Sequence, residues 1–264
     1  MASQRWIPLE SNPKASVKQG GCLSWFDCRL LLPGCCDLSP SRSHENEMSA
    51  VVLRNAYIQN LGVSNDWQFV DVYGLDDEML MMVPGPQAAV MLLYPLTENA
   101  KTKEIGTVDS SYPSSAYYLK QTIGNACGTV ALVHALANNE DKITFDETKH
   151  FRKFLNETKN ATPEERAKFL ENDQEMGSAH EESAQEGDTE APSRDVSVNP
   201  HFVTFVNVDG NLYEMDGRKE APVNHGKTSS DTLLQDTVKV VREFMARDPD
   251  EINFTLMVLA KVNE

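Results

Sequence analysis

The sequence predicts a single domain of the mixed α/β (α+β) class. The chain has 264 residues, 40% of them hydrophobic, which is enough to bury a sizeable core. Runs with the two-residue period of strands are interspersed with runs that have the period of helices. This mixture favours one sheet packed against helices.

Two strands and a buried helix are predicted in the first half of the chain. The stretches "WQFVDVYG" (67–74) and "AAVMLLY" (88–94) have strand composition, and "DDEMLMMV" between them is predicted to form a short helix. Few polar residues interrupt the apolar positions of Cys127–Ala137, which predicts a mostly buried helix. Asn138 and Asn139 then provide a helix stop.

Helix signals return in the second half. The sequence from Thr162 to Glu165 matches a capping box with proline at the first helical position, so "PEERAKFLEN" is predicted to be helical. A second helix is predicted from Ser229 or Ser230 to about Met245. The apolar run "FTLMVLA" predicts a final buried strand.

Two segments lack regular patterns. Residues 15–54 mix Cys, Gly, Pro and Ser with isolated large apolar residues, and we predict an irregular insertion there. Residues 171–199 hold nine acidic residues and one arginine, which predicts a long exposed loop. A solvated linker and a functional binding loop or lid both remain open for this second segment.

The charge balance restricts the partners. There are 24 basic and 40 acidic residues, giving a net charge of −16. Nucleic acid and anionic membranes are poor partners because a polyanion would be repelled, whereas a basic partner or peptide tail fits. The first residues lack the apolar core of a signal peptide, and no apolar run approaches the ~18 residues of a membrane helix. We therefore expect a cytoplasmic protein.

The five cysteines are distributed unevenly. Cys22, Cys28, Cys35 and Cys36 lie within fifteen residues, whereas Cys127 stands alone. A reducing compartment argues against a disulfide framework. The early cluster lacks paired C-x-x-C motifs, so we predict no zinc site, and nothing in the sequence indicates an organic cofactor.

A predicted hairpin brings a histidine close to a carboxylate. Asp209-Gly210 lies between two alternating runs, 201–208 and 211–216, and is a strong signal for a two-residue turn. The register that this turn sets makes His201 and Asp216 diagonal neighbours on one sheet face, roughly 7–8 Å apart between backbone positions. A carboxylate there would hold the imidazole in one tautomer and stabilise its charged form.

Cys127 stands where a polar loop meets the predicted helix. The positive end of the helix dipole and a nearby imidazolium can lower a thiol pKa from about 8.5 to roughly 3.5–7.5, which creates a nucleophilic thiolate. Gln121, six residues earlier, could donate its amide to an oxyanion together with the Cys127 backbone N–H. From spacing alone, a buried structural thiol remains open. We interpret His134, inside the helix, as a core histidine.

Eight stretches resemble the ubiquitin carboxyl-terminal hydrolase family of cysteine proteases, most closely its L-three isozyme type. They occur in family order and cover nearly the whole chain except about 15–54. The stretches are "QRWIPLESNP", "WQFVDVYG", "KQTIGNACGT", "HALANN", "SAQEGDTEAPS", "VDGNLYEMDGR", "NHGKTSSDTLL" and "RDPDEINF".

The resemblance implies a fold, an activity and four catalytic residues. The fold is that of a papain-like cysteine protease, with a central antiparallel sheet flanked by helices and a knotted backbone in a single domain. The activity is thiol-dependent hydrolysis at the C-terminal glycine of ubiquitin. By resemblance, Cys127 is the nucleophile, His201 the general base and acid, Asp216 the orienting carboxylate and Gln121 the oxyanion-hole glutamine.

The resemblance also implies partners. The substrate is ubiquitin or a ubiquitin-like modifier, whose flexible arginine-containing tail an acidic surface would attract. Residues 172–199 correspond to the active-site crossover loop of the family, beneath which the leaving group passes, so small adducts and short tails are favoured. The expected substrate contacts are Pro8, Leu9, Glu10, Ala184, Glu186, Gly187, Glu190 and Asn253.

Two functions follow from this resemblance. The first is that of a monomeric deubiquitinase in ubiquitin-dependent protein catabolism. The alternative is a catalytically impaired ubiquitin-binding isoform, because the insertion separates the N-terminal substrate contacts from the core.

Overall fold

The computed structural model describes residues 4–7, 50–185 and 199–262. Its centre is a seven-stranded sheet with the order β1-β7-β2-β4-β5-β6-β3, in which neighbouring strands are antiparallel. The strands are β1 (Trp67–Asp71), β2 (Gln87–Pro95), β3 (Thr107–Val108), β4 (Pro200–Val208), β5 (Asn211–Met215), β6 (Val223–Lys227) and β7 (Thr255–Lys261).

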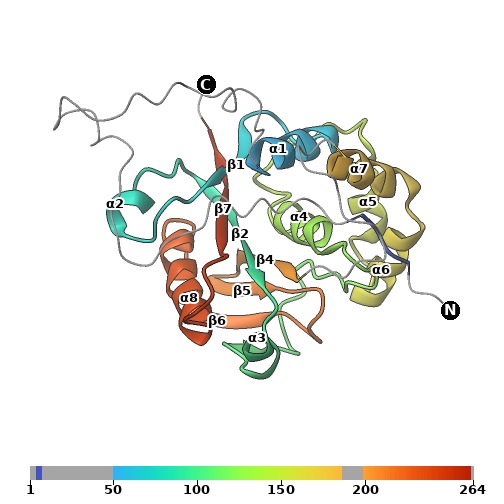
Figure 1. Ribbon diagram of the computed structural model, residues 1–264. Helices are drawn as coiled ribbons and strands as arrows, with labels where there is room; N and C mark the ends of the chain where they lie inside the picture. The colour runs from blue at the N-terminus through green and yellow to red at the C-terminus, as the bar shows by residue number, and fades with distance from the viewer. Residues whose placement is uncertain (1–3, 8–49, 186–198, 263–264) are drawn as a thin grey trace, which may run out of the picture.

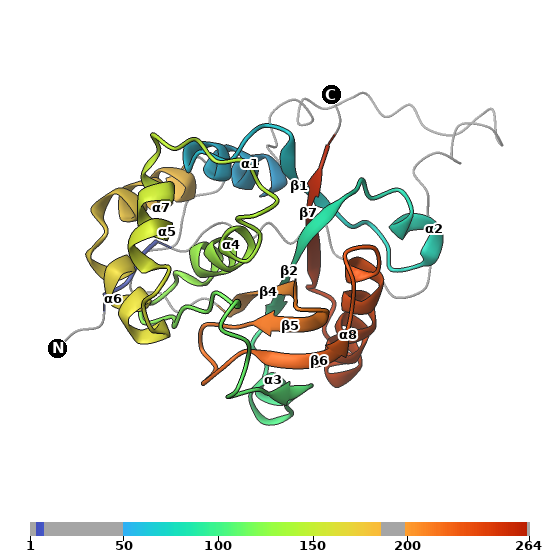
Figure 2. The same cartoon turned by 180° about the vertical axis from the view of Figure 1, so that it is seen from behind.

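Helices cover both sides of the sheet (Figures 1 and 2). One group lies on one side, and α8 with the short α2 lies on the other. Among the described residues, no helix is long and apolar enough to cross a membrane. The first group is α1 (Ala50–Asn60), α4 (Cys127–Ala137), α5 (His150–Thr158), α6 (Pro163–Asn172) and α7 (Gln174–Gln185); the others are α2 (Asp77–Leu80), α3 (Glu98–Thr102) and α8 (Leu233–Arg247).

The central strand β2 explains why its sequence is apolar throughout. Met91 and Leu93 belong to the core that the sheet forms with the first helix group, while Val90 and Leu92 belong to the core under α8. All four side chains are buried. A strand that is covered on both faces needs apolar residues at every position, because alternate side chains point to opposite faces.

The local signals that carry the site are confirmed. Helix α4 has the predicted bounds, and Thr162 with Glu165 forms the capping box at the start of α6. Asp209 and Gly210 have φ values of 50° and 76°, as expected for the central residues of a hairpin turn that matches the twist of the strands. The ladder of β4 and β5 has the predicted register.

Helix α7 corrects the prediction of a loop over 171–199. Its first turn is capped by Asp173, whose Oδ1 accepts from the Met176 N–H at 3.0 Å. Met176, His180 and Ala184 are four residues apart and buried on one face. The many acidic side chains hid this narrow stripe, so composition alone indicated a loop. The rest of the predicted crossover loop, 186–198, lies outside the described residues.

Several predicted boundaries also differ: β1 ends at Asp71 rather than at residue 74, and the short helix α2 covers only Asp77–Leu80. Helix α1 begins at Ala50, so residues 50–54 of the predicted insertion are helical, because this first turn continues a helix that buries Tyr57 and Ile58. The remainder, 15–49, lies outside the described residues. Helix α8 begins only at Leu233, since the Ser229 N–H donates to Thr232 Oγ1 at 3.1 Å and closes a separate turn ahead of it.

The N-terminal segment 4–7 lies against the loop that precedes α4. Gly124 donates its N–H to the Gln4 carbonyl oxygen, and Trp6 donates its N–H to the Gly124 carbonyl oxygen, both at 2.9 Å. His180 on α7 donates from Nε2 to the Ile7 carbonyl oxygen at 2.5 Å. This segment is therefore attached both to the loop before Cys127 and to α7. The knot stays a prediction.

Candidate active site

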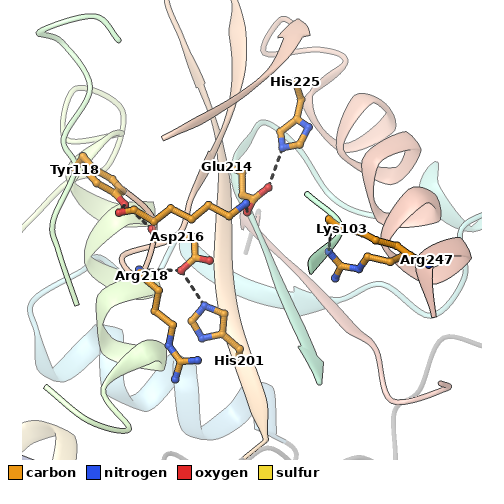
Figure 3. Close-up of polar contacts among 9 residues, drawn as sticks. Lys103, Tyr118, His201, Glu214, Asp216, Arg218, His225 and Arg247 are labelled. Atoms are coloured by element: carbon orange, nitrogen blue, oxygen red, sulfur yellow. Dashed lines mark hydrogen bonds and ion pairs between the residues drawn. The ribbon is translucent and has the colours of Figure 1, made fainter. Parts of the chain in front are cut away.

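His201 and Asp216 form a buried ion pair on neighbouring strands. His201 lies at the start of β4, and Asp216 directly follows β5. His201 Nε2 lies 2.9 Å from Asp216 Oδ1 (Figure 3). The two side chains are only 1% and 6% exposed. The diagonal contact that the hairpin predicted is therefore present.

The environment of His201 favours its charged form. Burial by itself lowers the pKa of the imidazole, but the charge and hydrogen bond of Asp216, together with Cys127, raise it to about 9. Burial raises the pKa of Asp216, and His201 more than offsets this, so that the carboxyl pKa is about 2. An imidazolium–carboxylate pair therefore persists across the neutral range.

Cys127 is the first residue of α4 and is buried. Burial alone would raise the pKa of its thiol, but His201, the Phe202 backbone and the charge of Arg218 together lower it. The N-cap residue of α4 is Ala126, which makes no side-chain capping bond. The thiol therefore experiences both the imidazolium and the positive end of the helix dipole, which favour a nucleophilic thiolate.

His201 and the Cys127 thiol are coupled without a regular hydrogen bond between them. His201 Nδ1 is buried and makes no hydrogen bond of good geometry within the described part of the chain. The same ring nevertheless interacts with the thiol. Such contacts are often long before substrate binds and tighten in the reacting complex. Tyr94, opposite His201 on β2, packs edge-on against the imidazole with 5.9 Å between the ring centroids.

Gln121 lies beside the turn that follows Asp216. Its backbone N–H donates to the Gly217 carbonyl oxygen at 2.8 Å. Its side-chain Nε2 donates to the Ile123 carbonyl oxygen at 3.3 Å, and its Oε1 is buried without a partner in the described residues. The amide is therefore held by a single long hydrogen bond, which leaves it able to turn towards a new acceptor.

Two arginines near the site were missed by the sequence analysis. Arg218 donates its backbone N–H to Asp216 Oδ1 at 3.0 Å, and its charge helps to lower the pKa of Cys127 (Figure 3). Arg54 is buried on α1, stacks over the Phe202 ring at 4.9 Å and couples electrostatically to Cys127. Arg218 could have been found from the sequence, because it lies only two residues after the predicted site residue Asp216. Arg54 could not be found in this way, because it belongs to the segment 15–54 that was predicted to be an irregular insertion.

The comparisons with known proteins decide the family. The profile of "Ubiquitin carboxyl-terminal hydrolase, family 1" matches residues 48–246. The chain belongs to this family. It is thus a cysteine-type hydrolase by family, as the sequence resemblance indicated.

Similar proteins cover most of the chain. A ubiquitin carboxyl-terminal hydrolase of Aplysia californica is 53% identical over 251 residues, which are 95% of this chain and all of the relative. Human ubiquitin carboxyl-terminal hydrolase isozyme L1 is 47% identical over 211 residues, 78% of this chain and 93% of the isozyme. Whether this chain is closest to the L-three isozyme type stays a prediction.

A solved structure shares the fold. The catalytic domain of Trichinella spiralis UCH37, bound to ubiquitin vinyl methyl ester, matches 80% of this chain and 93% of that domain with a TM-score of 0.65. The sequence identity is 24%. This confirms the predicted fold class of the hydrolase family.

The expected substrate contacts are only partly described. Asn253 is exposed and lines a surface hollow of about 280 Å³ together with Glu251 and Asn199. Ala184 is buried on α7, and its role as a substrate contact stays a prediction. The remaining contacts lie outside the described residues: Pro8, Leu9, Glu10, Glu186, Gly187 and Glu190. Within the described residues, no group of three or more metal-ligating side chains is present.

Proposed function

We propose that this chain is a deubiquitinating thiol hydrolase that removes small adducts or short peptides from the C-terminal glycine of ubiquitin. The observation that carries the proposal is the buried His201–Asp216 pair, 2.9 Å apart, beside the Cys127 thiol of lowered pKa. Membership of the ubiquitin carboxyl-terminal hydrolase family supports it, as does the fold shared with an enzyme that was captured with a ubiquitin derivative.

The proposed reaction has two halves. The Cys127 thiolate attacks the carbonyl carbon of the terminal glycine, and the oxyanion that forms accepts from the Gln121 amide and the Cys127 backbone N–H. His201 gives its proton to the leaving group, which departs and leaves a thioester on Cys127. Water then attacks the thioester while His201 accepts a proton. The second collapse releases the ubiquitin carboxylic acid, which ionises to solvent, and restores the Cys127 thiolate beside the protonated His201.

The substrate and setting belong to the same proposal. The net charge of −16 favours a basic tail such as that of ubiquitin, and a ubiquitin-like modifier with a similar tail would compete. Glu251 and Asn253 beside the 280 Å³ hollow are proposed contacts for the substrate. We also propose that the protein is a cytoplasmic monomer that acts in ubiquitin-dependent protein catabolism.

The alternative, an impaired ubiquitin-binding isoform, has one observation against it. The described residues on both sides of the insertion are packed in place: the 4–7 segment contacts the loop before Cys127, and α1 buries Tyr57 and Ile58. A long insertion between two anchored ends adds only a slowly growing loop entropy. The proposed site therefore does not require the insertion to be absent.

Hydrolysis of ubiquitin with a fluorogenic C-terminal adduct tests the proposal, with Cys127→Ala as the blank. We expect turnover by the full chain and none by the blank, which still binds ubiquitin. A shortened chain lacking residues 17–49 serves as a second arm. Turnover by the shortened chain alone would favour the impaired isoform, and turnover by neither would contradict the proposed function.

A further inference from the structure

Gly217, which directly follows Asp216, permits an unusually close approach of Gln121. The Gln121 N–H donates to the Gly217 carbonyl oxygen at 2.8 Å. A Cβ atom at position 217 would lie 2.9 Å from the Gln121 backbone nitrogen and 3.0 Å from the Gln121 Cβ. The first distance is shorter than real Cβ contacts allow, so a side chain here would force one of the two segments to move.

The turn after Asp216 is held by the segment that contains Gln121. The Tyr118 hydroxyl lies 2.5 Å from the Asp216 carbonyl oxygen and 2.7 Å from the Lys219 carbonyl oxygen. Tyr118 is fully buried. These contacts hold both ends of the turn, so a clash at position 217 cannot be relieved by swinging the whole turn away.

A neutral histidine ties the same segment to the nucleophile helix. The Leu119 N–H donates to His134 Nε2 at 3.0 Å, and burial lowers the pKa of His134 to about 4, so Nε2 stays an acceptor at neutral pH. His134 is on α4, the helix that begins at Cys127. The 118–121 segment is thus fixed between the nucleophile helix and the turn after Asp216.

We propose that Gly217 is a positioning residue that places Gln121 for oxyanion binding. This inference rests on the proposed function. A methyl group at position 217 would press on the Gln121 backbone and displace its amide from the Cys127 backbone N–H, with which it must share one oxyanion. The thiol–imidazole contact comes from α4 and β4. The added methyl group reaches α4 only through Val130 Cγ1, at 2.9 Å, and Val130→Ala removes that contact.

Steady-state kinetics of Gly217→Ala test the inference. We expect kcat to fall about 10- to 100-fold, somewhat less than for complete loss of an oxyanion donor, and KM to change less than about twofold. The pH profile of Cys127 alkylation is expected to stay as in the wild type, because His201 and Asp216 are unaffected. Gln121→Ala with Gly217→Ala is expected to be no more than about threefold slower than Gln121→Ala alone, since both changes remove one interaction.

Val130→Ala is the matched control for packing. The added Cβ would also lie 2.9 Å from Val130 Cγ1, so combining this change with Gly217→Ala relieves the side-chain clash but not the clash with Gln121. We expect Gly217→Ala to lower Tm and Val130→Ala alone to retain kcat. The double variant should regain part of the Tm that Gly217→Ala loses, while its kcat stays low.

Four outcomes would contradict the inference. They are an unchanged kcat in Gly217→Ala, recovery of kcat in the pair with Val130→Ala, additive losses with Gln121→Ala, and a shifted alkylation profile, which would indicate action through Asp216. An inactive wild-type chain would instead overturn the proposed function as well. The two failures are therefore distinguishable.

Discussion

Replacing Asp216 with asparagine separates the charge of the carboxylate from its hydrogen bonds. One oxygen, Oδ1, accepts from both His201 Nε2 at 2.9 Å and the Arg218 backbone N–H at 3.0 Å. An asparagine with its carbonyl oxygen in the same place keeps both bonds. Asp216→Asn therefore removes the negative charge and little else.

The structure sets the size of the effect. Asp216 and Cys127 together overcome burial and raise the pKa of His201 from 6.5 to about 9. This rise corresponds to about 3 kcal/mol in favour of the charged imidazole. Without the carboxylate, burial dominates, and we expect the thiolate–imidazolium pair to become about 100-fold less populated at neutral pH.

The assay is kcat/KM for a fluorogenic ubiquitin adduct across the pH range, together with iodoacetamide alkylation of Cys127. We expect kcat/KM of Asp216→Asn to fall about 100-fold near neutral pH and the alkylation midpoint to move to higher pH. Asp109→Asn is a matched control. The Asp109 carboxylate accepts from the hydroxyl of Tyr213 on β5 and not from His201, so this substitution should leave both readouts unchanged. A loss below about threefold with an unshifted alkylation profile would refute the electrostatic reasoning.

Four further predictions follow from the same structure. Gln121→Ala should lower kcat about 100- to 1000-fold with little change in KM, and steady-state kinetics would count against the oxyanion role if kcat were retained. Arg54→Met should raise the pH midpoint of thiol alkylation by removing a buried cation, and an unchanged midpoint would show that the coupling is negligible. Thr162→Ala should cost about 1 kcal/mol of unfolding free energy in urea, with kcat/KM unchanged, since it removes only the α6 cap. The stability advantage of the wild type over Asp216→Asn should be full between about pH 4 and 6.5. It should decline towards pH 9, through the raised pKa of His201, and towards pH 2, through the lowered pKa of the carboxyl; urea unfolding at several pH values that found a flat difference would oppose this.

Short-range sequence patterns were sufficient to predict several of the elements around the proposed active site. The apolar run of α4, the Thr162 capping box and the Asp209-Gly210 turn each involve residues within a few positions of one another. The turn also set the strand register, and the register placed His201 next to Asp216. This part of the site could therefore be predicted before any long-range contact was known.

The remaining elements depend on signals that were weak or were overlooked. Helix α5 buries Phe151, Phe154 and Leu155 at helical spacing, a pattern that was available in the sequence. The strand β3 has only two residues, too few to show a period. Helix α7 has only a narrow buried stripe, Met176, His180 and Ala184, which its many acidic side chains hid.

Close approaches between distant segments could not be predicted. Gly217 and Gln121 are far apart in the sequence, and no local pattern shows that their backbones meet at a 2.8 Å hydrogen bond. The same holds for the stacking of Arg54 on Phe202. These contacts arise from tertiary packing, which determines the positions of functional groups that have no motif of their own.

The most direct test of the account is covalent capture with ubiquitin that carries a C-terminal vinyl methyl ester, followed by peptide mapping of the modified cysteine. The chain has five cysteines, so the position of the adduct is informative. We expect one adduct, on Cys127, which forms quickly at neutral pH and much more slowly in Asp216→Asn. An adduct on Cys22, Cys28, Cys35 or Cys36, or no adduct at all, would contradict it.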